Sequence, residues 1–416
     1  MNKLIPPNLG RLLRVREFVL LWSGSTVSLF GDGIYFVTIA WEVYRISNLP
    51  TALGIVSAAF SLPQVALLVF GGVLSDRMDR RLLMLWMNLV SALMIGILGA
   101  LVLLNRIQLW EIVVLVAVYG VSQAFFLPAS RAIVPSLVAA DLVPQAMAME
   151  QFIQPLTGTL LGPALGGLLI AAGGTGFAFL IDAATFLVAA ATLSAMAYAP
   201  PASAGGEPGE RPSGRFAALH EAGLALAFIR RRPWMWAGLA AAAIANVALT
   251  GPLVVLIPFL IKYRLHAGPE ALGLVGACGG LGAILAAIYV SWRGVPRRDV
   301  IWMLICWSAA PASMIPMGLV NAAWQLMPLT FVTMAGLAIG NMIWFARMGV
   351  RVPGFMLGRV SSFDMMLSYC LIPLSMAITG PIAGVIGVRQ VFFWAGAAAC
   401  VVTLIFLVVP DLQADD

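Results

Sequence analysis

The stretch Gly72-Val73-Leu74-Ser75-Asp76-Arg77-Met78-Asp79-Arg80-Arg81 lies between two long apolar segments. Charged side chains are costly inside a bilayer, so this run is expected at a membrane interface, between two spanning helices. The rest of the chain agrees: of its 416 residues, 61% are hydrophobic and 10% are charged. Soluble domains carry about 25% charged residues. The composition therefore indicates a protein solvated mainly by lipid.

Apolar segments separated by short polar loops continue on both sides of this stretch. A span needs about 20 apolar residues, so the chain has room for roughly a dozen. We predict an all-α membrane protein with twelve spans, at about 18–45, 51–74, 82–104, 109–135, 144–172, 177–198, 234–262, 270–291, 300–320, 322–346, 358–386 and 388–409.

The basic residues are distributed unevenly between the two sides of these spans. With the amino terminus inside, 19 of the 24 Lys and Arg are cytoplasmic. The positive-inside rule favours that orientation, which predicts a multi-pass protein of the cell (inner) membrane with both termini cytoplasmic. We interpret the basic first sixteen residues as a cytoplasmic lead-in, because no small-residue cleavage site follows. The five basic residues predicted outside are Arg45, Arg106, Lys262, Arg264 and Arg389.

A linker divides the predicted spans into six and six. Residues 199–214 are rich in Pro, Gly, Ala and Ser, a composition that cannot form a packed core. Residues 215–232 have the spacing of an amphipathic helix that could lie on the membrane surface. We therefore predict a six-helix bundle over 1–198, a cytoplasmic linker with an amphipathic helix over 199–233, and a second six-helix bundle over 234–416.

The two predicted halves resemble each other weakly. The segment Gly162-Pro163-Ala164-Leu165-Gly166 recurs as Gly380-Pro381-Ile382-Ala383-Gly384, and Arg80-Arg81 recurs as Arg297-Arg298. Both matches are offset by six predicted spans. This pattern is typical of transporters built from two parallel repeats, with a substrate site near the midplane between the halves.

Two segments resemble motifs of the major facilitator superfamily, and the resemblance covers nearly the whole chain. Residues 72–81 are similar to motif A, with Asp79 where many members have glycine. Residues 158–167 are similar to motif C, the antiporter signature of the drug:H+ antiporter branch, which includes macrolide and siderophore exporters. The motif C residues are Gly158, Gly162, Pro163, Gly166 and Gly167. The motif B arginine, expected ahead of Gly120, is absent, so a proton relay built on it is not expected.

The resemblance implies a gate in motif A. Asp76 would face the helix amino terminus near Gly358 and would pair with Arg80, restraining opening of the cytoplasmic side. The helix dipole would stabilise such a carboxylate by about 0.3–1 kcal/mol, or up to ~2 kcal/mol if partly buried. The alternative is that the arginines only fix the topology. The other residues of this predicted gate are Gly72, Arg77 and Arg81.

Motif C also has two interpretations. Its glycines would let helices approach closely, and Pro163 would kink its helix. The resemblance further implies that the motif restrains the closed interface and limits leak.

Asp32 is the sharpest candidate for a functional residue, since it lies near the middle of the first predicted span. An aspartate at a helix centre costs about 2.5–3.5 kcal/mol on insertion scales. Polar residues share its helical face within about 100°, so this stripe should face the bundle interior. We predict a role in proton coupling or substrate contact; the alternative is a structural, hydrogen-bonded acid. The stripe contains Ser25, Ser28, Asp32, Tyr35 and Glu42.

Three further sets of polar residues fall inside predicted spans. Glu150, Gln154 and Thr157 form one face of the fifth span. Asp364 lies on a polar face of the eleventh, where pairing with Arg347 or Arg359 is as plausible as a functional role. Asp182 lies early in the sixth span, where we favour a structural role. The predicted cavity set is Asp32, Glu42, Tyr35, Ser28, Glu150, Gln154 and Asp364.

These features favour a secondary transporter that exports amphiphilic, drug-like small molecules by proton-coupled alternating access. Siderophore or lysolipid export is the alternative within the same fold. A membrane-embedded enzyme would need clustered acids for a metal or a nucleophile–base pair, and neither is evident. We therefore predict no enzymatic activity, no cofactor and no metal, and ATP is excluded because a phosphate loop with lysine is missing. The expected partners are the substrate, protons and the lipid bilayer, without nucleic acid, and the expected state is a monomer.

Overall fold

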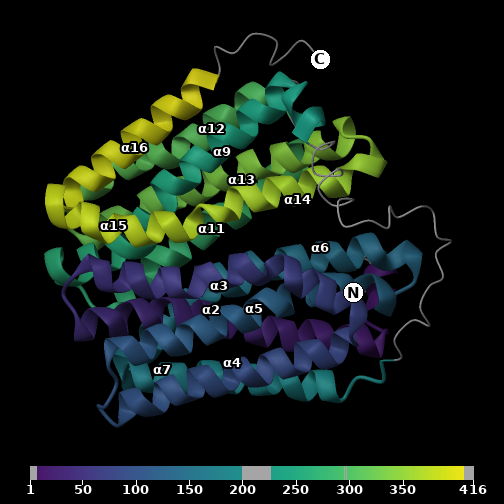
Figure 1. Cartoon of the computed structure of the whole chain (residues 1–416), viewed down its shortest axis with the longest axis horizontal. Helices are drawn as coiled ribbons and strands as arrows, with labels where there is room; N and C mark the ends of the chain where they lie inside the picture. The colour runs from purple at the N-terminus through teal and green to yellow at the C-terminus, as the bar shows by residue number, and fades with distance from the viewer. Residues whose placement is uncertain (1–6, 199–225, 295, 297, 407–416) are drawn as a thin grey trace. The chain divides into compact units, whose positions relative to one another are not determined.

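The computed structural model describes residues 7–198, 226–294, 296 and 298–406. Within these ranges every regular element is a helix (Figure 1). The helices up to residue 194 are α1 (Pro7–Leu12), α2 (Arg16–Ile46), α3 (Pro50–Arg77), α4 (Arg80–Leu103), α5 (Leu109–Leu137), η1 (Ala140–Leu142), α6 (Val143–Ile153), η2 (Gln154–Leu161) and α7 (Gly162–Ser194).

Residues 226–230 are helical as well, and the other helices follow from Pro233 onward. They are α9 (Pro233–Gly251), η3 (Pro252–Leu256), α10 (Ile257–Phe259), η4 (Leu260–Arg264), α11 (Pro269–Arg293), α12 (Asp299–Met314), η5 (Ile315–Leu319), η6 (Ala323–Gln325), α13 (Leu326–Arg351), α14 (Gly354–Cys370), α15 (Ile372–Ile386) and α16 (Val388–Ile405). The helices η2, η3 and η4 are π-helices.

The all-α membrane fold is confirmed, and the number of spans is consistent with twelve. Ten helical stretches of the described residues are long and apolar enough to cross a membrane. One of them, Ala140–Ser194, covers the two predicted spans 144–172 and 177–198, and its backbone breaks at Gly174, where φ is +80°. The helix α2 is not among the ten, although its 31 residues are long enough. The polar stripe around Asp32 lowers its hydropathy.

The described chain forms two compact units. The first contains Met1–Ser203 and Pro258–Gly280, and the second contains Ala204–Ile257 and Leu281–Asp416. Residues Pro258–Gly280 of the first unit come from the seventh and eighth predicted spans, which the sequence assigns to the second six-helix bundle. The predicted domain limits stay a prediction. Most of the predicted amphipathic helix at 215–232 lies outside the described residues.

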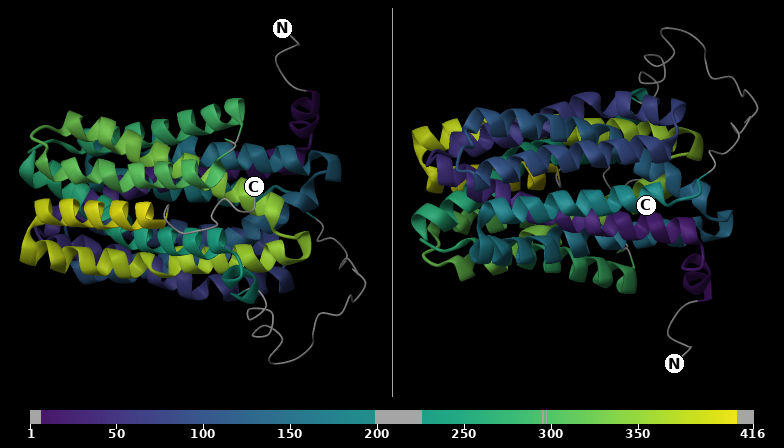
Figure 2. Two further views of the ribbon diagram at one scale, coloured as in Figure 1. Left: turned by 90° about the horizontal axis from the view of Figure 1, so that it is seen from above. Right: turned by 90° about the horizontal axis from the view of Figure 1, so that it is seen from below.

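Close contact between α2 and α7 organises the first unit, whose helices run lengthwise beside one another (Figures 1 and 2). A Cβ atom added at Gly33 would lie 2.8 Å from the Cα of Gly162, and one added at Gly162 would lie 2.8 Å from the carbonyl oxygen of Phe30. Without side chains at these positions, the two backbones can touch, as small residues allow in membrane helices.

The core of the second unit contains three packed tryptophans. The ring of Trp344 lies 5.6 Å from that of Trp234 and 5.9 Å from that of Trp307. Beside them, buried Arg347 forms an ion pair with Asp299 and lies 4.9 Å from the centre of the Trp234 ring. The cation is therefore held by a carboxylate and by an aromatic face.

Gly162→Ala should destabilise the first unit by about 1–3 kcal/mol, because the added methyl group would push α7 away from α2. Gly96→Ala is the matched control, since a Cβ atom there meets only the Cβ of Ala183 at 3.8 Å. Thermal unfolding in detergent measures the effect. Equal melting temperatures for the two variants would contradict the close approach of the helices.

Candidate functional site

Asp32 is hydrogen-bonded to a tyrosine from another helix. The side chain is half-buried on α2, and the hydroxyl of Tyr119 on α5 donates to its Oδ1 at 2.5 Å. One turn further along α5, the Nε2 of Gln123 donates to the Tyr119 hydroxyl at 3.0 Å. A carboxyl, a phenol and an amide thus form a continuous polar chain inside the first unit. The expected inward direction of the Asp32 stripe agrees with the burial of Ser28 and Tyr35.

Aromatic rings fix the Tyr119 phenol in place. The Tyr119 ring lies 5.1 Å from Tyr35, 5.2 Å from Phe60 and 5.8 Å from Phe186, and the Tyr35 and Phe186 contacts are edge-on. Edge-on and offset ring pairs of this kind add about 0.5–1.5 kcal/mol each. The hydroxyl is consequently held toward Asp32 by packing on several sides.

Asp182, to which the sequence assigned a structural role, lies next to the Asp32 segment. It is fully buried on α7, and its Oδ1 lies 3.5 Å from the Oγ1 of Thr185. A methyl group at Gly31 would overlap both Thr185 Oγ1 and Asp182 Oδ1, so this carboxyl sits against the backbone beside Asp32. Its Oδ2 has no hydrogen-bond partner among the described residues. The structural role expected for Asp182 stays a prediction, and its position against α2 could not be read from the sixth span alone.

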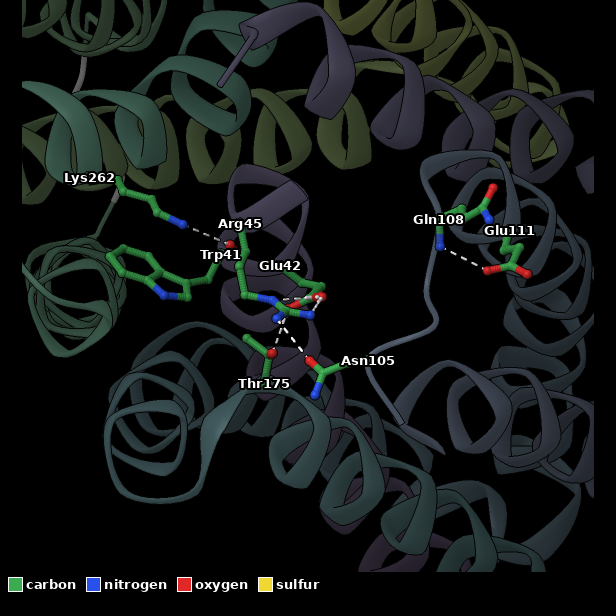
Figure 3. A network of polar contacts seen from close by, with 8 residues as sticks. All are labelled: Trp41, Glu42, Arg45, Asn105, Gln108, Glu111, Thr175 and Lys262. Carbon is green, nitrogen blue, oxygen red and sulfur yellow. Dashed lines mark hydrogen bonds and ion pairs between the residues drawn. The ribbon is translucent and has the colours of Figure 1, made fainter. Parts of the chain in front are cut away.

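Glu42 is neutralised by an arginine one turn away (Figure 3). The carboxylate is fully buried and accepts from Arg45 Nη2 at 2.7 Å and from Thr175 Oγ1 at 2.6 Å. The Nη1 of Arg45 reaches Asn105 at 3.4 Å. These contacts join the end of α2 to α7 and to the turn after α4. Glu42 therefore belongs to an ion pair near the carboxyl end of α2, ten residues after Asp32.

A lysine and a cluster of aromatic residues join the same end of α2 to η4. The Nζ of Lys262 lies 4.8 Å from the centre of the Trp41 ring and donates to the Trp41 carbonyl oxygen at 3.4 Å (Figure 3). Beside it, the Tyr263 hydroxyl donates to the carbonyl oxygen of Tyr44 at 2.6 Å. We call Trp41, Tyr44, Lys262 and Tyr263 the α2–η4 latch. The latch is held by a cation–π contact and by hydrogen bonds from the Lys262 and Tyr263 side chains to backbone carbonyl oxygens.

In motif A, three charged residues complete helix ends. The Asp79 side chain accepts from the backbone amides of Arg81 and Leu82 at 2.9 and 3.2 Å, so it caps α4. Arg80 donates to the carbonyl oxygen of Ala132 at 3.0 Å, and Arg81 donates to that of Leu193 at 2.7 Å. Cations at carbonyls near helix carboxyl ends also complement the helix dipoles. The side chain of Asp76 and that of Arg359 lie outside the described ones, so the predicted Asp76 gate stays a prediction.

Motif C has two packed faces. Gly162 and Gly166 face α2, where a Cβ at Gly166 would lie 3.0 Å from the Cα of Ile34. Gly167 faces α11, where a Cβ would lie 2.6 Å from the carbonyl oxygen of Pro269. The π-helix η2 (Gln154–Leu161) contains the first residues of the motif, including Gly158, and such segments often mark functional positions. The predicted close packing is present, while the predicted restraint of leak stays a prediction.

Within the first unit, no described hydrogen bond joins Glu150 or Gln154 to Asp32. Glu150 is half-buried on α6 and Gln154 is exposed at the start of η2, whereas Thr157 is buried and bonded to its own helix. Asp364 belongs to the second unit, where it is buried and accepts from the Trp344 indole at 3.2 Å. The structure therefore describes an Asp32 site in one unit and an Asp364 contact in the other.

Long helices with large apolar side chains exposed along their length define a multi-span membrane protein. The sequence profile of the Major Facilitator Superfamily matches residues 21–374, and the chain belongs to this family. Its fold agrees with solved transporters. A nucleoside transporter, NupG (D323A mutant), superposes with a TM-score of 0.70 at 12% identity, covering 94% of this chain and 99% of that one. The family and the structural neighbours are transporters rather than enzymes.

Curated relatives of the chain include several exporters. It is 24% identical over 408 residues to multidrug efflux pump Tap of Mycolicibacterium fortuitum, covering 93% of this chain and 94% of that one. It is 27% identical over 282 residues to the transporter YfiS of Bacillus subtilis, covering 67% and 65%, and 26% identical over 156 residues to macrolide efflux protein A of Streptococcus pyogenes, covering 37% and 38%. The chain thus aligns with less than two thirds of the length of YfiS and of macrolide efflux protein A.

Lys262→Gln should destabilise the first unit by about 0.5–2 kcal/mol, because it removes the cation from the Trp41 ring. Lys262→Arg should retain most of the stability, since arginine can occupy the same aromatic face. Arg264→Gln is the matched control on the same helix, where the side chain is exposed. Melting temperatures in detergent compare the three variants. If Lys262→Gln and Arg264→Gln behave alike, the cation–π contact contributes nothing to the latch.

Proposed function

We propose that the chain is a proton-coupled exporter of amphiphilic small molecules that works by alternating access. The observation that carries the proposal is the hydrogen bond from Tyr119 to Asp32, in the middle of a membrane helix. An ionisable group at that depth is expensive, so it is expected to serve transport or coupling. Export, as opposed to uptake, is supported by the relatives named as efflux proteins.

In this proposal, the protonation state of Asp32 decides which facing state is favoured. The ionised carboxylate accepts the Tyr119 hydroxyl strongly, because charge-assisted hydrogen bonds are about twice as strong as neutral ones. A proton on Asp32 weakens that bond and removes the charge from the bundle interior. A cationic or amphiphilic substrate would compete for the same carboxylate. Proton binding and substrate binding then bias the same equilibrium in opposite directions, as reciprocal coupling requires.

The other motifs would support this cycle at the two ends of the helices. Motif A would restrain the predicted cytoplasmic end, where Arg80 and Arg81 hold helix ends together. The α2–η4 latch lies at the predicted outer end, beside the Glu42–Arg45 ion pair. Both termini are proposed to be cytoplasmic, in the cell membrane of a bacterium, and the transporter is proposed to act as a monomer.

Siderophore export is the second candidate. The chain is 26% identical over 368 residues to enterobactin exporter EntS of Citrobacter koseri, covering 85% of this chain and 82% of that one. A macrolide, a lipophilic cation and a catecholate siderophore would therefore form the first substrate panel.

Asp32→Asn should abolish efflux driven by a pH gradient while leaving folding and insertion intact, because asparagine keeps the shape and loses the exchangeable proton. Tyr119→Phe should reduce efflux at least about tenfold, since losing a hydrogen bond to a charged group costs about 1.5–3 kcal/mol. Uptake of the panel into proteoliposomes with an imposed pH gradient measures both effects.

The matched control for these variants is Tyr198→Phe, which removes a phenol hydroxyl in the same unit, where Tyr198 follows α7 and lies 3.5 Å from the Oγ of Ser136. It should retain gradient-driven transport. Wild-type rates for Asp32→Asn would place coupling elsewhere in the chain. Transport by wild type that is unaffected by the pH gradient would refute proton coupling itself.

A further inference from the structure

Asp182 is the buried acid that the proposed cycle leaves unused. It lies in the middle of α7, is fully buried, and has one carboxyl oxygen without a partner among the described residues. Taking an ion out of water costs several kcal/mol unless a counter-charge or hydrogen bonds replace the solvent. The hydroxyl of Thr185, at 3.5 Å, is a weak replacement. The environment of Asp182 therefore disfavours the carboxylate.

The charged groups around Asp182 can be followed helix by helix. On α2, the backbone at Gly31, next to Asp32, lies against the Oδ1 of Asp182. On α5, Tyr119 donates to Asp32 and its ring packs on Phe186 of α7. Asp182 is the one titratable residue of α7, and η2 contains none. On α4, Arg81 donates to the carbonyl oxygens of Leu193 and Ser194 on α7, at least about 16 Å along the helix from Asp182 at 1.5 Å per residue.

We propose that Asp182 is a second proton-binding carboxyl and that it forms one coupled site with Asp32, whose ligand is the proton. Asp32 is half-buried and Asp182 is fully buried, so in this proposal the proton enters at Asp32 and passes to Asp182. In the transfer step, the carboxyl of Asp32 gives its proton to the carboxylate of Asp182 and becomes the carboxylate again, so the charge of the pair is unchanged. Two carboxyl groups that interact strongly titrate as a pair.

The pair has a consequence for transport. A negative charge on one carboxyl disfavours ionisation of its neighbour, so Asp182 keeps its proton while Asp32 is ionised. This consequence rests on the proposed function, because it matters to transport only if protons are coupled to it. The protonation of Asp182 itself can be measured without any substrate.

Infrared difference spectroscopy of the detergent-solubilised full chain tests this inference. Stepwise pH changes in H2O and in D2O should reveal the carbonyl band of a buried, protonated carboxyl. Asp182→Asn should remove that band. Asp32→Asn should keep it and move the pH at which it disappears, since the neighbouring charge is gone. Asp141→Asn, an exposed carboxyl in the same unit, is the control and should leave both the band and its pH unchanged.

A second variant guards against misfolding of Asp182→Asn. Thr185→Val keeps the side-chain volume, removes the hydroxyl next to Asp182, and should shift the frequency of the same band. The inference is overturned if Asp182→Asn removes no band, or if the band neither exchanges with deuterium nor responds to Asp32→Asn. If the infrared test fails but gradient-driven transport still depends on Asp32, only the assignment of Asp182 is wrong. If Asp32 and Asp182 titrate as a pair but transport is not coupled to protons, only the proposed function is refuted.

Discussion

The backbone contact between α2 and α7 at Gly33 and Gly162 is the constraint on which the rest of the first unit depends. A side chain at either position would separate the helices, and small-residue packing is the main means by which membrane helices associate. A second contact, between α2 and the part of α7 after the break at Gly174, determines the surroundings of the acidic residues of α2. It places Asp182 against the backbone at Gly31, next to Asp32, and Thr175 beside Glu42, so the polar chemistry follows from helix packing.

The three acids along this contact are accommodated in three ways. Glu42 has a full counter-charge in Arg45, which makes it a structural element. Asp32 has one strong hydrogen bond from Tyr119 and partial access to solvent, which allows it to change state. Asp182 has neither a cation nor a strong donor among the described residues. All three residues lie in apolar helices, but their partners differ in strength. Glu42 is held in an ion pair, whereas Asp32 is the acid proposed to change its protonation state.

Much of the fold could be predicted from the sequence, because lipid solvation requires long apolar helices. Charged stretches such as residues 72–81 mark the loops between them. The inward direction of the Asp32 stripe followed from helical periodicity on one helix. The partner of Asp32 could not be found in this way, since Tyr119 is 87 positions away on another helix. The pairing of Glu42 with Arg45 could have been found, because residues three apart on a helix are neighbours. The position of Asp182 required the packing of α7 on α2.

Proton release on substrate binding tests the central claim most directly. If substrate and proton compete for Asp32, adding substrate to the detergent-solubilised protein in weakly buffered solution should release protons in a saturable manner. The account predicts this release for wild type and its loss in Asp32→Asn, provided that both proteins bind the substrate. Saturable binding with no proton release by wild type, or with equal release by Asp32→Asn, would contradict the assignment of coupling to Asp32.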